Sequence, residues 1–225
     1  MEGLDTAVRV EVVREKDELR RWKAKKSTTE RIYTASPDAL VKAAHLQSIL
    51  KFIDSHPEPL AREIRSHIAP DTLKAVEGSM RIKWLPASVD VEMTEAAYVT
   101  LSPEEFKNFW IRYGLSTLGS PLLKHALEAA LRLFGLSISR LITWTPQAFN
   151  AYYKNCGQLE VGEHTDRYCH LVHSGVPQGL IRSRPFIRGC AYAFAAIYPL
   201  TRTEGEVLRK DYKPANGSVT YLYYW

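Results

Sequence analysis

Cysteine is scarce in this sequence. The three cysteines, Cys156, Cys169 and Cys190, are an odd number and lie far apart along the chain. Small secreted proteins use paired cysteines as disulfide bridges, so this scarcity favours free thiols in a reducing compartment. No apolar segment follows the opening Met-Glu-Gly-Leu-Asp, which argues against a secretory leader. We therefore expect a cytoplasmic protein.

Long apolar runs are also missing. The longest uncharged apolar stretches, residues 141–153 and 190–200, fall short of the roughly 20 residues that a membrane-spanning helix needs. We expect no transmembrane segment.

The sequence lacks the common catalytic motifs. It contains no Gly-x-Ser-x-Gly, no Gly-x4-Gly-Lys-Ser/Thr, no Gly-x-Gly-x-x-Gly and no His-Glu-x-x-His. The stretch Ser48-Ile49-Leu50-Lys51 spells Ser-x-x-Lys, but it falls inside an amphipathic segment and has no companion motif. We expect a non-enzymatic protein, and an enzyme with scattered, motif-free active residues stays open as an alternative.

Basic residues are in modest excess, with a formal net charge of +5. Five of them lie between residues 20 and 26, directly after the acidic Glu15, Asp17 and Glu18, which cancel part of their field. A basic adaptor that binds an acidic protein or nucleic acid is therefore a second alternative, although nucleic acid is not favoured because no groove-reading element is evident.

Four Ser-Pro or Thr-Pro pairs predict helix starts. They begin at Ser36, Ser102, Ser120 and Thr145, and each precedes apolar residues at helical spacing. The hydroxyl can accept a bond from a free amide of the first turn, and proline loses nothing at a position whose amide has no partner. At Ser102 the prediction is stronger, because Glu105 completes a capping box. We expect helices from Pro37 to about Asp54, from Pro59, and after the three later pairs.

The last seventy residues alternate between strand and helix patterns. Residues 159–161 and 168–173 read as one hairpin, and residues 206–212 and 218–225 as another with Asn216-Gly217 in its turn. Between them, Ser183 precedes a helix that Pro199 should end. The sequence predicts an α+β fold in which an N-terminal helical layer packs on a C-terminal antiparallel sheet of strand-strand-helix-strand-strand order.

The domain organisation follows from these patterns. Residues 1–35 combine an alternating strand pattern at Val8, Val10 and Val12 with the charged segment. Residues 36–225 show no repeat and no low-complexity linker, so we expect one α+β domain with a helical part at 36–156 and a sheet part at 157–225.

Short motifs between residues 80 and 225 resemble an uncharacterised family of myxobacterial paralogous proteins. They are Trp84-Leu85-Pro86, Pro121-Leu122-Leu123, the segment 131–137, Trp144-Thr145-Pro146 and the terminal Tyr224-Trp225. The order of elements is distantly similar to the ligand-binding fold of haem nitric-oxide/oxygen sensors, 4-vinyl reductase domains and TRAPP subunits. This resemblance implies a pocket between helices and sheet that senses a small molecule or serves as a scaffold, often in a dimer.

Haem sensors of that fold carry a Tyr-x-Ser-x-Arg triplet and a proximal histidine, and this triplet is missing here. The terminal strands also lack the cysteines that 4-vinyl reductase domains usually show. We therefore expect no cofactor, and the sequence argues against haem.

Our first hypothesis is a sensor or scaffold domain that binds an apolar small molecule or a protein partner between helices and sheet. The candidate residues of that cavity are the aromatic side chains at helix and strand positions facing the expected gap. They are Phe109, Trp110, Tyr113, Phe149, Phe194, Tyr221 and Tyr223.

Two further clusters are weaker candidates for binding sites. Arg182, Arg184 and Arg188 stand at the start of the helix after Ser183 and could hold a carboxylate or phosphate. Cys169 and His173 would share one face of a strand, but ligand pairs at zinc spacing are missing from the sequence, so we expect no metal site.

Overall fold

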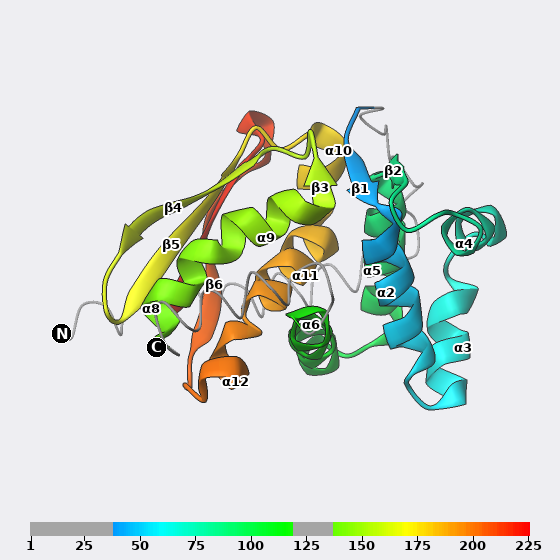
Figure 1. Ribbon diagram of the computed structural model, residues 1–225, viewed down its shortest axis with the longest axis horizontal. Helices are drawn as coiled ribbons and strands as arrows, with labels where there is room; N and C mark the ends of the chain where they lie inside the picture. The colour runs from blue at the N-terminus through cyan, green and yellow to red at the C-terminus, as the bar shows by residue number, and fades with distance from the viewer. Residues whose placement is uncertain (1–37, 119–136) are drawn as a thin grey trace.

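The computed structural model describes residues 38–118 and 137–225. A four-stranded antiparallel sheet forms one side of the molecule, and helices form the other (Figure 1). Helices α9 (Thr145–Tyr152) and α11 (Arg184–Phe194) lie between the sheet and α6 (Pro103–Leu118). The predicted α+β class, with N-terminal helices and a C-terminal antiparallel sheet, is confirmed.

The first described helix begins later than the sequence predicted. We expected a helix from Pro37, but α2 spans Ala43–Asp54, and the preceding Leu40–Lys42 form strand β1. Strand β1 pairs antiparallel with β2 (Trp84–Pro86) and β3 (Tyr153–Lys154) in a small sheet of order β2-β1-β3. These pairings link segments far apart in the sequence, which helical periodicity does not reveal. Ser36, Pro37 and the predicted strand at Val8–Val12 lie outside the described residues.

Helix α3 (Glu58–Ser66) follows as predicted, with Ile64 buried. The next helices, α4 (Pro70–Glu77) and α5 (Ser88–Thr100), were not predicted. Buried residues occur on several sides of α5, so it lacks the polar stripe by which a surface helix is recognised. Helix α5 contacts α2, α3, α6 and α11, and it therefore lies in the core.

The capping box at α6 is present. The Ser102 amide donates to Glu105 Oε2 at 2.8 Å, and the Glu105 amide donates to Ser102 Oγ at 3.3 Å. The helix predicted after Ser120 lies outside the described residues. The chain returns with α8 (Ile138–Leu141), the 3-10 turn η1 (Ile142–Trp144) and α9, which begins at the predicted Thr145.

Both predicted hairpins are present in the C-terminal sheet. Their strands are β4 (Gln158–His164) with β5 (Tyr168–Ser174), and β6 (Glu206–Lys213) with β7 (Ser218–Tyr224). Strands β5 and β7 pair at the centre, with Leu171 opposite Tyr221, which gives the order β4-β5-β7-β6. The turn η2 (Pro214–Asn216) ends at Gly217, whose φ of 61° explains the glycine.

Helix α11 packs its apolar face between this sheet and the helical layer. Ser183 caps its first turn by accepting a bond from the Phe186 amide at 3.3 Å. The prediction that the helix runs to Pro199 is wrong, because α11 ends at Phe194 and Pro199 lies inside the short α12 (Ile197–Thr201). The remaining short helix, α10 (Gln178–Ile181), precedes Ser183. In the two described ranges, none of the helices combines the length and the apolar character that crossing a bilayer requires.

Candidate functional site

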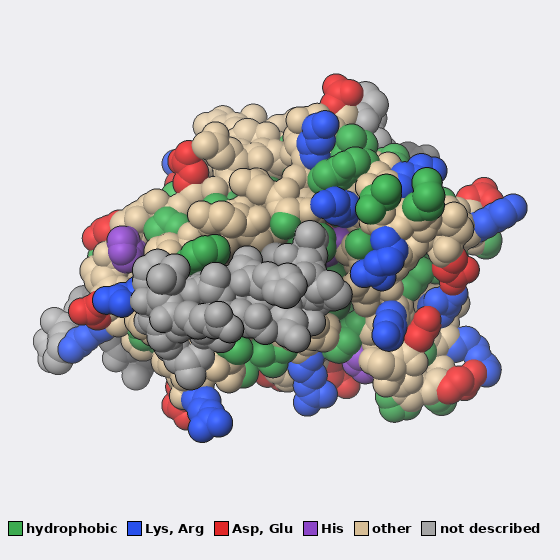
Figure 2. Space-filling view, viewed as in Figure 1, with side chains coloured by type: hydrophobic (Ala, Val, Ile, Leu, Met, Phe, Trp, Pro, Cys, Tyr) green, Lys and Arg blue, Asp and Glu red, His purple; other side chains and the backbone are tan. Residues whose placement is uncertain are grey.

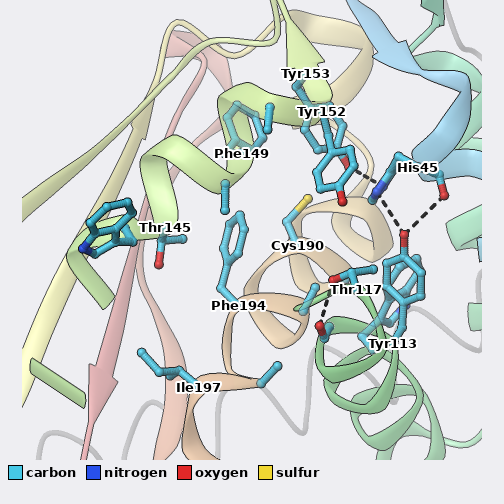
Figure 3. A pocket seen from close by; sticks show the side chains of 18 of the residues that line it. His45, Tyr113, Thr117, Thr145, Phe149, Tyr152, Tyr153, Cys190, Phe194 and Ile197 are labelled. Carbon is cyan, nitrogen blue, oxygen red and sulfur yellow. Dashed lines mark hydrogen bonds between the residues drawn. The ribbon is translucent and has the colours of Figure 1, made fainter. Parts of the chain in front are cut away.

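A cavity of about 270 Å³ lies between the helical layer and α11. Its walls come mainly from α6, α9, α11 and α12 (Figure 3), and His45 from α2 and Asp90 from α5 also line it. Aromatic and aliphatic side chains make most of the surface. Helical residues and Tyr153 of β3 line the cavity, and none of the described lining residues belongs to the four-stranded sheet, so the space lies among the helices and not between helices and sheet, where the sequence analysis expected it.

Small residues of α11, of the link to α12 and of α6 line the cavity. Gly189, Cys190 and Ala193 lie on α11, Ala196 follows it, and Gly114 lies on α6. A methyl group at Gly114 would lie 2.2 Å from the Ala193 carbonyl oxygen, so α6 and α11 approach as closely as they do only because glycine stands there.

The opposite wall is built by α9. The ring of Phe149 stacks on that of Tyr153, with centroids 4.6 Å apart and planes inclined by 15°. The same ring meets His173 of the sheet edge-on at 4.9 Å. Phe149 therefore joins the cavity wall to strand β5, and its ring meets that of Phe194 of α11 edge-on, with centroids 6.4 Å apart (Figure 3).

The end of the cavity near α2 is polar. His45 Nδ1 lies 3.0 Å from the Tyr113 hydroxyl, and His45 Nε2 lies 3.0 Å from the Tyr153 hydroxyl (Figure 3). Tyr153 donates to Asp90 Oδ2 at 2.5 Å, and that oxygen is 3.3 Å from His45 Nε2. Four elements far apart in the sequence thus contribute to one buried hydrogen-bond network.

The polar end keeps its phenols and its thiol protonated. Burial, followed by the charge of Asp90, raises the pKa of Tyr113 and Tyr153 well above the ordinary value. The same two causes raise the pKa of the Cys190 thiol, which points into the cavity (Figure 3). At neutral pH these three groups are therefore uncharged hydrogen-bond donors, and the Cys190 thiolate that a nucleophile requires is scarce.

The predicted cavity residues divide into two groups. Trp110, Tyr113, Phe149 and Phe194 line the cavity. Phe109 lies instead against Phe52, with ring centroids 5.0 Å apart. The hydroxyls of Tyr221 and Tyr223 donate to the carbonyls of Ile187 and Ala191 on α11, at 3.2 and 2.9 Å. These two tyrosines fix α11 to the sheet.

The three candidate anion-binding arginines lie in different surroundings. Arg182 is exposed and donates to Gln178 Oε1 at 3.1 Å, and Arg184 lies over the ring of Tyr212 at 5.8 Å. Arg188 is buried beside Tyr98, where burial raises the tyrosine pKa and the Arg188 charge opposes that rise. A shared anion site of these arginines stays a prediction.

On the face seen in Figure 2, basic and acidic side chains are interspersed around α3 and α4.

Cys169 and His173 share the inner face of β5 as expected, and both are buried. His173 Nε2 lies 3.0 Å from the Cys156 carbonyl oxygen, and Cys169 Sγ lies 3.6 Å from the His170 carbonyl oxygen. Among the described residues, histidine, cysteine and carboxylate side chains do not gather in groups of three that could hold a metal ion.

The sequence analysis missed His45, Asp90, Tyr153 and Cys190 as site residues. One signal was available in and just after α11, where the small residues Gly189, Ala193 and Ala196 follow helical spacing. The polar residues gave no local signal, because their elements come together only in the folded chain.

The chain is similar in structure to H-NOX proteins. The unliganded Fe(II) protein from K. algicida aligns with a TM-score of 0.56 at 10% identity, covering 81% of this chain and 95% of that one. The Fe(II)NO protein from S. oneidensis aligns with 0.54 at 8% identity, over 81% and 97%. A structure described as probing heme distortion in the H-NOX family aligns with 0.50 at 9%, over 82% and 94%. The distant similarity to the haem-NO-binding fold is thus confirmed.

No protein-family model matches the chain, and no curated protein matches it either. The resemblance to the uncharacterised myxobacterial family therefore stays a prediction.

The expectation of no cofactor, and the argument against haem, must be corrected. The structures to which this chain is similar are H-NOX proteins described with Fe(II), Fe(II)NO and heme. The missing Tyr-x-Ser-x-Arg triplet does not argue against haem, because proteins that share a fold at about 10% sequence identity need not share local motifs. The cavity also contains donors of the kinds that hold haem iron: the His45 imidazole, the Cys190 thiol and the phenols of Tyr113, Tyr152 and Tyr153. These donors fit a haem in type.

Proposed function

We propose that this chain is a small-molecule-sensing domain that binds its ligand in the cavity between α6, α9 and α11. The observation that carries the proposal is the cavity itself, because it combines apolar walls with a few convergent polar groups at one end. Such a combination is what small-molecule sites in proteins usually have.

The position of the cavity supports sensing rather than storage. Its walls are helical, and they include α6 of the helical layer and α11, which Tyr221 and Tyr223 fix to the sheet. A ligand that fits one relative position of the layers better than another would shift the population of that position. A non-enzymatic role in the cytoplasm, with a protein partner that reads the change, belongs to the same proposal.

Haem, which the comparisons favour, is the alternative to a smaller occupant, and it would require the cavity of about 270 Å³ to widen. His45 is the residue that would hold its iron. A bound haem would supply an iron centre to which a diatomic gas could bind. Both ring nitrogens of His45 face tyrosine hydroxyls at 3.0 Å, so ligation to iron would replace one of these contacts.

Native mass spectrometry of the purified chain tests the proposal. We expect a co-purifying small molecule, or binding of one from a panel of apolar metabolites that includes haemin. Ala148→Phe should abolish this binding, because Ala148 lines the cavity and a phenyl ring would fill part of it. Asn150→Phe is the matched control, because Asn150 is exposed on the same helix.

Three outcomes separate the alternatives. A bare protein mass together with unchanged melting temperatures across the panel would refute ligand binding in the cavity. Haemin that leaves its absorbance spectrum unchanged on mixing would exclude haem but leave the cavity proposal standing. Binding that Ala148→Phe retains at the strength of Asn150→Phe would show that the ligand binds elsewhere.

A further inference from the structure

We infer that the ligand of this cavity is a compact apolar molecule with one hydroxyl group, which binds where Asp90, Thr94 and Trp110 meet. The inference rests on the proposed function, because it names the class of ligand that the same cavity takes.

The first observation is a buried donor. Trp110 lines the cavity and is only 3% exposed. Its indole Nε1 is shielded from solvent and finds no acceptor among the described residues. Leaving a buried N–H without an acceptor is destabilising, and native proteins satisfy nearly all such groups. An oxygen atom of a bound ligand would supply the acceptor that this indole lacks.

The second observation places an acceptor nearby. A methyl group at Gly189 would lie 3.1 Å from Thr94 Cγ2 and 3.3 Å from Trp110 Nε1, so both side chains pack closely on this glycine, and all three residues line the cavity. Thr94 Oγ1 lies 3.5 Å from Asp90 Oδ1, at the limit of a hydrogen bond. This long contact leaves Oδ1 able to accept a further bond, whereas Oδ2 already accepts from Tyr153 at 2.5 Å.

The Asp90 carboxylate and the Trp110 indole N–H together select the polar group of the ligand. A hydroxyl both donates and accepts, so it can donate to Asp90 and accept from Trp110. A carboxylate would meet the negative charge of Asp90, and an ammonium group has no lone pair for the indole N–H. A pure hydrocarbon would leave both protein groups without a partner.

The remaining walls select the body of the ligand. Phe149, Phe194 and Ile197 lie along the part of the cavity away from His45 (Figure 3). The volume of about 270 Å³ falls just below the usual range of about 300–1,000 Å³ for small-molecule sites. A single ring with a short alkyl chain is therefore a suitable size.

Isothermal titration of the full chain with four compounds of one frame tests the inference. The compounds are 4-butylphenol, butylbenzene, 4-butylbenzoate and 4-butylbenzylamine. We expect 4-butylphenol to bind about tenfold more tightly than butylbenzene, which corresponds to one well-placed hydrogen bond. The benzoate and the benzylamine should bind more weakly than the phenol.

A pair of variants assigns the effect to the indole. Trp110→Phe removes the N–H, and the preference for 4-butylphenol over butylbenzene should fall severalfold. Trp84→Phe is the matched control, because Trp84 is also partly shielded from solvent but lies in β2 and is not among the residues that line the cavity. This variant should keep the preference of the unmodified chain.

The outcomes distinguish this inference from the proposed function. Butylbenzene that binds as tightly as 4-butylphenol would overturn the hydroxyl site and leave the apolar cavity site intact. If none of the four compounds binds and Ala148→Phe changes nothing in the mass spectrum, the proposed function fails, and this inference fails with it. A preference that survives Trp110→Phe would overturn the role of the indole. The four compounds are also titrated into the unmodified chain, so the hydroxyl preference can be measured even if a variant folds poorly.

Discussion

Burial decides the protonation of several single residues in this protein. The pKa of His173 is lowered to about 4, and burial is the main cause. The pKa of Cys156 and Cys169 rises to about 12 and about 11, again chiefly through burial. His173 is therefore neutral near pH 7, and its Nε2 can donate to the Cys156 carbonyl while its ring packs on Phe149.

We predict that His173 makes the protein less stable in mild acid. In the unfolded chain His173 is protonated near pH 6.5, whereas in the folded chain it is protonated only near pH 4. The contribution of neutral His173 to the free energy of unfolding is therefore fully present above pH 6.5 and is lost as the pH falls from 6.5 to about 4. The loss amounts to about 3 kcal/mol on this difference. Urea unfolding at pH 7, 5.5 and 4 measures it.

His173→Gln is the control for this effect, because glutamine keeps an amide donor and does not titrate. The variant should be less stable than the unmodified chain at pH 7 but should lose less stability toward pH 4. Parallel pH profiles for the two proteins would rule out His173 as the source.

Residues of the candidate site differ in how well the sequence predicted them. Trp110 and Tyr113 were found because they belong to an apolar stripe at helical spacing, which marks the face that α6 buries. His45 and Asp90 could not be found in this way, although they are 8% and 1% exposed. Nothing local distinguishes a buried histidine from a surface one until its partners Tyr113 and Tyr153 are placed beside it.

At the scale of elements, the contact between α6 and α11 sets the shape of the cavity. Gly114 lies against Ala193 and Ala196, and these residues all line the cavity. The two helices are therefore held close at this point, and Gly189 and Cys190 line the cavity beside it.

We predict that Gly114→Ala destabilises the fold by at least about 1–3 kcal/mol. Alanine improves helix propensity by about 1 kcal/mol, but its methyl group would lie 2.2 Å from a backbone oxygen, which cannot move without shifting α11. Thermal unfolding measures the change. Gly162→Ala is the matched control, because Gly162 is exposed in β4 and a methyl group there would lie 3.4 Å from its nearest neighbour. Equal melting temperatures for the two variants would contradict the close contact.

Elements with strong local signals were predicted well. Both C-terminal hairpins, the capping box of α6 and the serine cap of α11 follow from short-range chemistry that the sequence displays. Strands β1, β2 and β3 were missed, since three short segments from distant parts of the chain form strands only by pairing with each other. Helix α5 was missed because it is buried on several sides and has no amphipathic pattern.

At the scale of the whole molecule, the cavity lies among α6, α9, α11 and α12, and α11 is also the helix that packs on the sheet. Tyr221 and Tyr223 tie α11 to the sheet, and Gly114 lets α6 pack on the other side of α11. Helix α11 therefore belongs to both layers, so a ligand against it contacts the region on which their association depends.

This arrangement predicts that a bound ligand stabilises both layers together. Binding at a hundred times the dissociation constant should add about 2.7 kcal/mol to the free energy of unfolding. Because the cavity walls come from α6, α9 and α11 alike, the far-ultraviolet and near-ultraviolet circular dichroism transitions should move to higher temperature by the same amount. Ala148→Phe should remove the shift in both signals, and Asn150→Phe should keep it. If 4-butylphenol shifted only the aromatic signal, the ligand would be acting on one part of the molecule, and coupling of the two layers through α11 would be wrong.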